Sequence, residues 1–219
     1  MNDLAAMGLS EMYYGYFCFS KGDRERSKQH FEKSIKHSEE TKWMFLSAFS
    51  WGTLGYACAM LGDPVTGKRL MEKGLKIHRD SGAEMYLSMA YCRLGEIHRH
   101  LGDLQNARSL VEEGLRLSQK NNEKHMEGWS RLVLGSILGK NVPLQIHKAE
   151  ACFLKGIEIL KELRMKAMYS IGYLGLGQLY LNAGEKEKAI ENLKKAEGMF
   201  REMGMDYWLG KAREVLATL

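Results

Sequence analysis

The sequence predicts an all-α protein built from consecutive helical hairpins, and three observations support this prediction. A set of small and apolar residues recurs about every 40 positions along the 219 residues, which is the pattern of a repeat architecture. Within each repeat the apolar residues are spaced by three and four, the period of an amphipathic helix. The chain contains 2 prolines, and proline interrupts helices because it removes a hydrogen bond and clashes with the preceding turn.

The first helix of each repeat carries a glycine that follows a large apolar residue. These glycines are Gly15, Gly55, Gly95, Gly135 and Gly177, with steps of 40, 40, 40 and 42 residues. Four repeats have another glycine seven residues later, namely Gly22, Gly62, Gly102 and Gly184. We expect this later glycine to end the first helix in the left-handed conformation. Two extra residues around positions 140–144 account for the longer fourth step.

The second helix of each repeat carries two columns of small residues on either side of a large apolar one. The first small column holds Ser27, Gly67, Ala107, Ala149 and Ala189, and the second holds Ser34, Gly74, Gly114, Gly156 and Ala196. The large column between them holds Phe31, Met71, Val111, Phe153 and Leu193. Glycine costs about 1 kcal/mol relative to alanine inside a helix. Its repeated use therefore indicates that the paired helices cross closely.

These columns resemble the tetratricopeptide repeat (TPR) family over essentially the whole chain. The residues that carry the resemblance are Trp51-Leu54-Gly55, Tyr91-Leu94-Gly95 and Tyr173-Leu176-Gly177-Tyr180, followed by Ala107, Ala149 and Ala189. The units are longer than the family's usual 34 residues and are similar to those of helical arrays in bacterial signalling proteins. The closing stretch 199–219 is similar to the ends of arrays attached to bacterial nucleotide cyclases and ATPase-type transcription regulators.

The resemblance implies a right-handed superhelical solenoid of five helical hairpins and a C-terminal capping helix. We expect one TPR-like domain over residues 1–219, with units at about 8–47, 48–87, 88–127, 128–169 and 170–204 and a cap at 205–219. The cap has the phase of the first helix of a sixth unit, without its second helix, which is a usual way to close a solenoid.

Composition and charge favour a cytoplasmic protein that binds neither membranes nor nucleic acid. The net charge is +5, and acids alternate with bases along most of the chain, as on solvated helix faces. The four cysteines are far apart and form no metal-binding spacing, and the N-terminus lacks a basic secretory leader. Residues 43–62 carry no charge, but they share the phase of residues 83–102, which carry several. We therefore interpret both as helices of one stack rather than membrane spans.

The sequence contains no motif for catalysis, cofactor binding or metal binding, so we expect a protein that is not an enzyme. His98 and His100 lie about 200° apart around a helix, which predicts a packed His98 and an exposed His100 rather than a metal site. Gly175 and Gly177 lie inside a helix with no preceding strand and form no nucleotide fingerprint. The paired carboxylates Glu39-Glu40 and Glu112-Glu113 are expected on solvated surface.

Aromatic, methionine and arginine residues mark a candidate binding surface. In a stacked array the first helices line the concave side, and these residue types are enriched in the cores of protein interfaces. The candidate partner-binding residues are Tyr13, Tyr16, Tyr56, Met60, Arg93, Glu96, Arg99 and His100. Packing between neighbouring units is the alternative for residues of this lining, above all for Phe49, Met89 and Trp129.

The leading hypothesis is a non-catalytic interaction module whose concave groove binds a peptide, helix or partner domain with apolar anchors and an acidic residue. Chaperone-tail binding is disfavoured, because the family's clamp positions hold Met12, Tyr16, Thr53, Met89 and Arg93, and only Arg93 fits. One alternative is a regulatory segment of a larger bacterial signalling protein that contacts its own effector domain or a second copy. Another is nucleic-acid binding through the basic residues Lys140, Lys148, Lys155, Lys161, Arg164 and Lys166.

Overall fold

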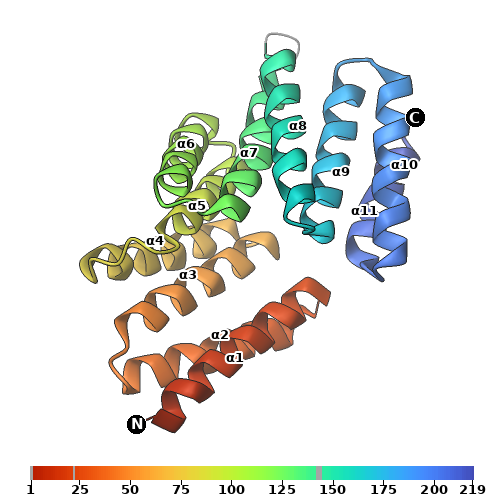
Figure 1. The fold of residues 1–219 in the computed structure, drawn as a ribbon. Helices are drawn as coiled ribbons and strands as arrows, with labels where there is room; N and C mark the ends of the chain where they lie inside the picture. The colour runs from red at the N-terminus through yellow and green to blue at the C-terminus, as the bar shows by residue number, and fades with distance from the viewer. Residues whose placement is uncertain (1, 22, 142–144) are drawn as a thin grey trace. The chain divides into compact units, whose positions relative to one another are not determined.

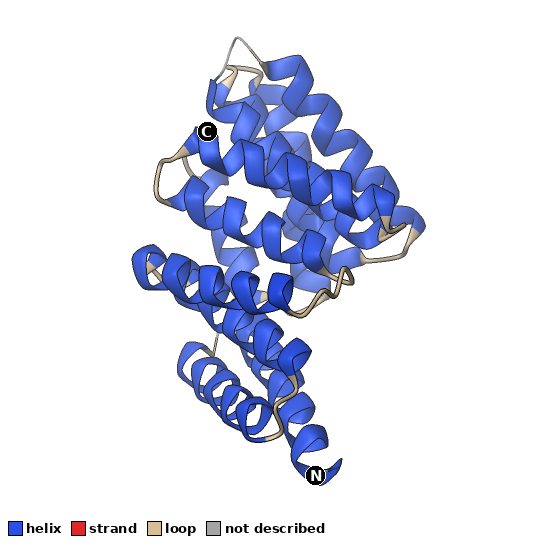
Figure 2. Ribbon diagram, turned by 90° about the vertical axis from the view of Figure 1, so that its left-hand side faces the viewer, coloured by secondary structure: helices blue, strands red, loops and turns tan. Residues whose placement is uncertain are grey.

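The computed structural model describes residues 2–21, 23–141 and 145–219, and this part of the chain is helical without a strand (Figure 2). By its internal contacts the chain divides into two compact units, Met1–Leu117 and Ser118–Leu219. The expectation of a single domain over residues 1–219 stays a prediction. Gly22 and residues 142–144, which the sequence places in two of the turns, lie outside the described residues.

The first unit contains three pairs of helices that follow one another along the chain (Figure 1). The helices are α1 (Asn2–Lys21), α2 (Arg24–Glu40), α3 (Met44–Met60), α4 (Pro64–Asp80), α5 (Leu87–His100) and α6 (Leu104–Lys120), whose last three residues belong to the second unit. α1 packs on α2 and α3 packs on α4. α5 meets α6 where Gly95 faces the side chain of Val111. The first helices of the second and third pairs, α3 and α5, also pack on the pair before them. α3 packs on α2, and α5 packs on α4.

The second unit repeats this pairing. Its elements are α7 (Lys124–Leu138), a short 3-10 turn (Gly139–Asn141), α8 (Ile146–Glu162), α9 (Lys166–Asn182), α10 (Lys186–Glu202) and α11 (Asp206–Leu216). α7 packs on α8 and α9 packs on α10. The last helix, α11, packs on α10, where Trp208 stacks on the buried Phe200 with ring centroids 6.2 Å apart.

Turn residues set the helix ends as their chemistry predicts. Gly62, Gly102 and Gly184 have φ angles of +103°, +80° and +78°, so the prediction of left-handed glycines after the first helices is confirmed there. The residue after the turn glycine is an aspartate in two of these repeats. Asp63 accepts a hydrogen bond from the Thr66 amide at 3.0 Å, which satisfies one of the free donors at the start of α4.

Small residues lie where two helix backbones meet, as the sequence predicts. A Cβ atom placed on Gly74 of α4 would lie 2.5 Å from the backbone nitrogen of Gly52 and 2.7 Å from the carbonyl oxygen of Ala48, both on α3. The large residues of the neighbouring column fill the core between successive pairs. In the first unit Phe31 clusters with Leu54 and other buried side chains, and Met71 clusters with Leu94 and Ile97.

Several smaller predictions can be compared with the described residues. His98 is buried and His100 is exposed, as predicted. Glu112 and Glu113 lie on the surface and pair with Arg108 and Arg116. The four cysteines are free thiols. None of the described helices is both long and apolar enough to cross a membrane.

Candidate functional site

Arg93 on α5 is the centre of the candidate site in the first unit. Its guanidinium carbon lies 5.2 Å from the ring centroid of Tyr16 on α1 and 5.0 Å from that of Tyr56 on α3. Both distances are within the range of a cation–π contact. Tyr16 and Tyr56 occupy the same position of consecutive repeats, so the repeat itself brings two rings to the arginine.

A threonine on α3 connects these side chains by hydrogen bonds. Thr53 Oγ1 donates to the carbonyl oxygen of Phe49 at 2.7 Å. Because a hydroxyl has a single proton to donate, Thr53 Oγ1 must accept from Tyr16 Oη at 3.0 Å and from Arg93 Nη1 at 3.4 Å. We call Tyr16, Thr53, Tyr56 and Arg93 the Arg93 cluster.

Burial and charge shift the pKa values of Tyr56 and Arg93. Burial raises the pKa of Tyr56 well above its usual value, the neighbouring Glu96 carboxylate raises it further, and Arg93 acts in the opposite direction. Burial lowers the pKa of Arg93, but Tyr16, Tyr56 and Glu96 outweigh it and the pKa rises. Glu96 itself is 6% exposed. The cluster therefore holds a charged guanidinium within reach of two tyrosine rings.

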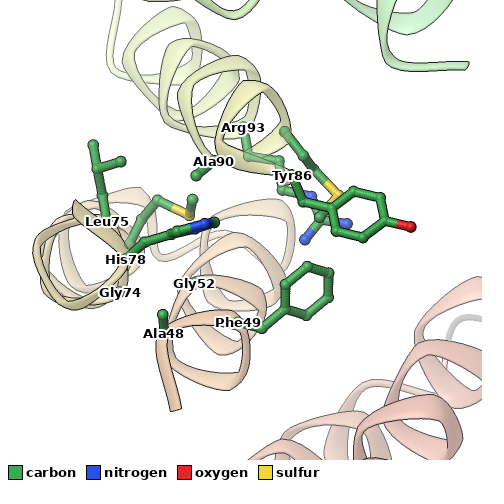
Figure 3. Close-up of a pocket in the computed structure, with 11 residues that line it drawn as sticks. Ala48, Phe49, Gly52, Gly74, Leu75, His78, Tyr86, Ala90 and Arg93 are labelled. Carbon is green, nitrogen blue, oxygen red and sulfur yellow. The ribbon is translucent and has the colours of Figure 1, made fainter. Parts of the chain in front are cut away.

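An apolar recess adjoins the Arg93 cluster between α3, α4 and α5 (Figure 3). Its cavity volume is about 20 Å³, which is room for about one water molecule. The residues that line it are Ala48, Phe49, Gly52, Met71, Gly74, Leu75, His78, Tyr86, Met89, Ala90 and Arg93. Arg93 thus belongs both to the cluster and to the wall of the recess, which places a positive charge beside an apolar hollow.

Tyr86 borders the recess because the backbone departs from the repeat. Lys42, Gly82 and Asn122 share one turn position and have positive φ angles, whereas Tyr86 has a φ of +61° outside that column. It precedes α5, which begins at Leu87, and its ring lies 6.0 Å from that of Phe49. Figure 3 shows the two rings at one side of the recess. A left-handed tyrosine costs about 1–2 kcal/mol, which the surrounding contacts must offset.

The structure brings together only some of the residues that the sequence nominates. Tyr16, Tyr56 and Arg93 meet directly, and Glu96 acts on Tyr56. Tyr13 is 67% exposed on α1 and makes no described contact with the cluster.

Met60, Arg99 and His100 lie towards the end of their helices. Met60 packs against the apolar cluster around Met71 and Ile97. Arg99 Nη2 lies 3.1 Å from His100 Nε2 at the end of α5. Met60 therefore supports the packing between repeats, as the alternative interpretation predicted for part of the lining.

Tyr86 and His78 line the recess but are not among the candidate residues predicted from the sequence. His78 is 3% exposed, and its ring lies edge-on to Phe45 at 5.8 Å. His78 lies outside the repeated columns of the second helices, so the repeat pattern does not draw attention to it. The position of Tyr86 depends on where α5 begins, which the repeat pattern does not predict. Phe49 and Met89, which the sequence assigned to packing between units, line the recess.

Two of the positions that form the chaperone-tail clamp in the TPR family, Met12 and Thr53, are buried in this chain. Met12 is 5% exposed and Thr53 is 2% exposed. Neither can contact a ligand carboxylate, because both lie under neighbouring side chains. Among the described residues, no group of three or more His, Cys, Asp or Glu side chains lies close enough to hold a metal ion.

A wider hollow opens on another part of the first unit, between α4, α5 and α6. It is lined by Arg79, Tyr91, Ser109, Leu110, Glu112, Glu113 and Arg116. Its charged side chains already have partners within the unit. Arg116 binds both carboxylate oxygens of Glu113 at 2.7 and 2.8 Å, and Arg79 donates to the Tyr91 hydroxyl. The Arg93 cluster is therefore the better candidate for recognising a charged partner.

Comparison with known proteins identifies the sequence family and the fold. The family described as the MalT-like TPR region matches residues 10–219. No curated protein is similar enough in sequence to match the chain.

Among solved structures, the Rap conjugation gene regulator of plasmid pLS20 in complex with the Phr* peptide is similar with a TM-score of 0.78 and 16% identity, over 96% of this chain and 58% of that one. A Rap protein complexed with competence and sporulation factor has a TM-score of 0.74 and 12% identity, over 99% and 64%. A signal transduction ATPase with a tetratricopeptide repeat sensor from Pyrococcus horikoshii has a TM-score of 0.64 and 19% identity, over 88% and 31%. These likenesses establish a TPR-like helical repeat fold.

Proposed function

The chain belongs to the family of MalT-like TPR regions, and we propose that its first unit binds a protein or peptide segment at the Arg93 cluster and the adjoining recess. The observation that carries the proposal is the double role of Arg93, which is held by two tyrosine rings and also lines the recess. An apolar anchor of the partner would lie against the mouth of the recess, and an acidic group would lie beside the guanidinium. The chain's role is binding, without catalysis and without a cofactor.

The charge and shape of the site support this partner chemistry. Burial makes an arginine costly unless it is paired, and Tyr16, Tyr56 and Thr53 already orient it. Preorganisation of this kind favours binding because less side-chain freedom is lost when the partner arrives. One of the similar structures is a complex of a Rap regulator with a peptide, which is consistent with the proposal.

We also propose the finer architecture that the resemblance implies. The described helices would form a right-handed superhelix of five hairpins with α11 as the cap, in one domain with units at about 8–47, 48–87, 88–127, 128–169 and 170–204. The pairing of α1 with α2, α3 with α4, α7 with α8 and α9 with α10 supports the hairpins. A cytoplasmic location is part of this proposal.

A regulatory role within a larger bacterial signalling protein is the second candidate. This chain covers 31% of the similar ATPase, whose repeats are described as a sensor. In that arrangement the partner at the Arg93 cluster would be a domain of the same polypeptide. Nucleic-acid binding is not favoured, because Lys155 and Lys166 of the basic stretch pair with Glu158 and Glu202.

The proposal can be tested with a random peptide library displayed on phage. Peptides selected on the full chain are expected to share a large apolar residue close to an acidic one. Affinity for one selected peptide is then measured by fluorescence anisotropy for the native chain and for Arg93→Gln and Met89→Asp. Each substitution should weaken binding at least about tenfold, because it removes the positive charge or places a carboxylate in the apolar recess.

Val65→Glu is the matched control, because Val65 is 70% exposed on α4 and does not line the recess. This variant should bind like the native chain. Far-UV circular dichroism establishes that all variants remain helical. Selected peptides that bind Arg93→Gln and Met89→Asp with native affinity would refute the assignment of the site.

A further inference from the structure

An uncharged band of side chains is exposed along α1. Its large members are Met7, Tyr13, Tyr14 and Phe17, which are 49%, 67%, 62% and 59% exposed. The remaining exposed positions of the same stretch are Ala6 and Ser10. We call these six residues the α1 face. The largest apolar patch on the surface of a protein is often a functional one.

In the next repeat the equivalent surface is buried. The positions 40 residues further on, in α3, are all buried: Leu46, Ser47, Ser50, Thr53, Leu54 and Ala57. α2 covers them, since Leu54 and Ala57 share an apolar cluster with Phe31 and Ile35, and Ser50 hydrogen-bonds Ser34 at 2.7 Å. The α1 face is therefore the counterpart of an interface that already exists one repeat later in the same unit.

The chemistry of the α1 face restricts its partner to an uncharged surface of similar extent. The other exposed large hydrophobic side chains of the described chain are scattered over separate helices and turns, at Met44, Val65, Met85, Leu101, Leu154, Leu163 and Tyr207. The last helix, α11, exposes the charged residues Lys211, Arg213 and Glu214, so a head-to-tail contact would bury charges against tyrosine rings. The surface that best complements the α1 face is a second α1 face.

We propose that two copies of this chain associate through their α1 faces in a two-fold symmetric dimer. Such a contact uses the same patch on both partners. Aromatic side chains each offer about 150–250 Å², so the partly exposed rings and Met7 give on the order of 450 Å² per copy. The total of about 900 Å² is below the roughly 1,200–2,000 Å² of stable specific interfaces, so the dimer is a weak and transient one. The contact is separate from the Arg93 cluster, so either proposal can fail without the other.

Sedimentation velocity of the full chain tests the dimer across about 1 μM to about 300 μM, a range suited to interfaces of this size. The mass of the native chain should rise with concentration from 25.0 kDa towards twice that value. The double variant Tyr14→Glu/Phe17→Glu should raise the dissociation constant at least about tenfold, because pairing would bury carboxylates without partners. The control Val65→Glu/Leu154→Glu adds the same charges at exposed apolar positions elsewhere and should dimerise like the native chain.

A cysteine at the middle of the α1 face provides a second measurement. Under mild oxidation Ser10→Cys should form a covalent dimer, whereas Val65→Cys should not, because only the former would lie close to its own copy. A native chain that stays monomeric over the whole range, or a double variant that dimerises as strongly as the native chain, would overturn the proposal. Assemblies larger than a dimer would also overturn it, since a two-fold contact closes after two copies.

Discussion

Substitution of Gly74 by alanine tests whether the small-residue columns exist to let helices cross closely. The added Cβ would lie 2.5 Å from Gly52 N, 2.9 Å from Gly52 Cα and 2.7 Å from Ala48 O. All three atoms are backbone atoms of α3, so a side-chain rotation cannot relieve the contact. Because ordinary contacts begin at about 3.4 Å, α3 and α4 must separate by roughly 1 Å in a densely packed interior.

The expected magnitude follows from two opposing contributions. Overpacking a tight interior costs about 1–3 kcal/mol, whereas replacing glycine by alanine inside a helix returns up to about 1 kcal/mol. We therefore expect Gly74→Ala to lower the free energy of unfolding by about 1–2 kcal/mol. Urea unfolding followed by far-UV circular dichroism and tryptophan fluorescence measures this change, and Trp43 and Trp51 report on the first unit.

Gly52→Ala is the control on the same helix pair. Its added Cβ would lie 3.4 Å from Met71 Cε and 3.5 Å from Met71 Sδ, which are the flexible end of a side chain in ordinary contact. This variant should range from neutral to about 1 kcal/mol more stable than the native chain, because the gain in helix propensity has little to oppose it. Equal stability of Gly74→Ala and Gly52→Ala would refute the packing explanation of the columns.

Three further predictions concern charges and phenols of the first unit. Arg93→Met should lower the free energy of unfolding by about 1–3 kcal/mol, because two cation–π contacts and a hydrogen bond are lost, and thermal unfolding at neutral pH measures it. The pKa of Tyr56 is raised, so its contribution to stability is complete below about pH 10 and is lost as the pH rises towards the folded-state pKa. Tyr56→Phe should therefore reduce the fall in the free energy of unfolding at alkaline pH, as measured by urea unfolding at a series of pH values. The pKa of Asp103 is lowered by hydrogen bonds from Asn106 and His98, so its contribution is present above about pH 4 and is lost below it. Asp103→Asn should reduce the acid-side slope of stability, and an unchanged slope would remove Asp103 from that role.

The sequence predicts the helices and their contacts well because repeated columns encode them. Gly62 and Gly102 take the left-handed conformation expected of the first turns, and Gly74 meets the backbone of α3 as close crossing requires. The left-handed turns and the close helix crossings both require a residue with little or no side chain. A glycine repeated at the same position of successive repeats is therefore enough to predict them.

The candidate site is predictable only in part. Tyr16 and Tyr56 stand one repeat apart, so their alignment follows from the repeat, and Arg93 occupies the position equivalent to Thr53 in the next repeat. That the guanidinium lies between the two rings depends on rotamers, which residue spacing does not determine. The placement of Tyr86 depends on a positive φ at a residue that is not glycine, which no repeat column predicts.

The environment of Tyr13 shows why one column can have different roles along an array. Tyr13, Thr53 and Arg93 occupy the same position of three successive repeats. Thr53 and Arg93 have a preceding pair of helices to pack against, and both join the Arg93 cluster. Tyr13 on α1, by contrast, is 67% exposed. The same repeat position is therefore buried in α3 and exposed in α1, and the exposed tyrosine is part of the proposed dimer contact.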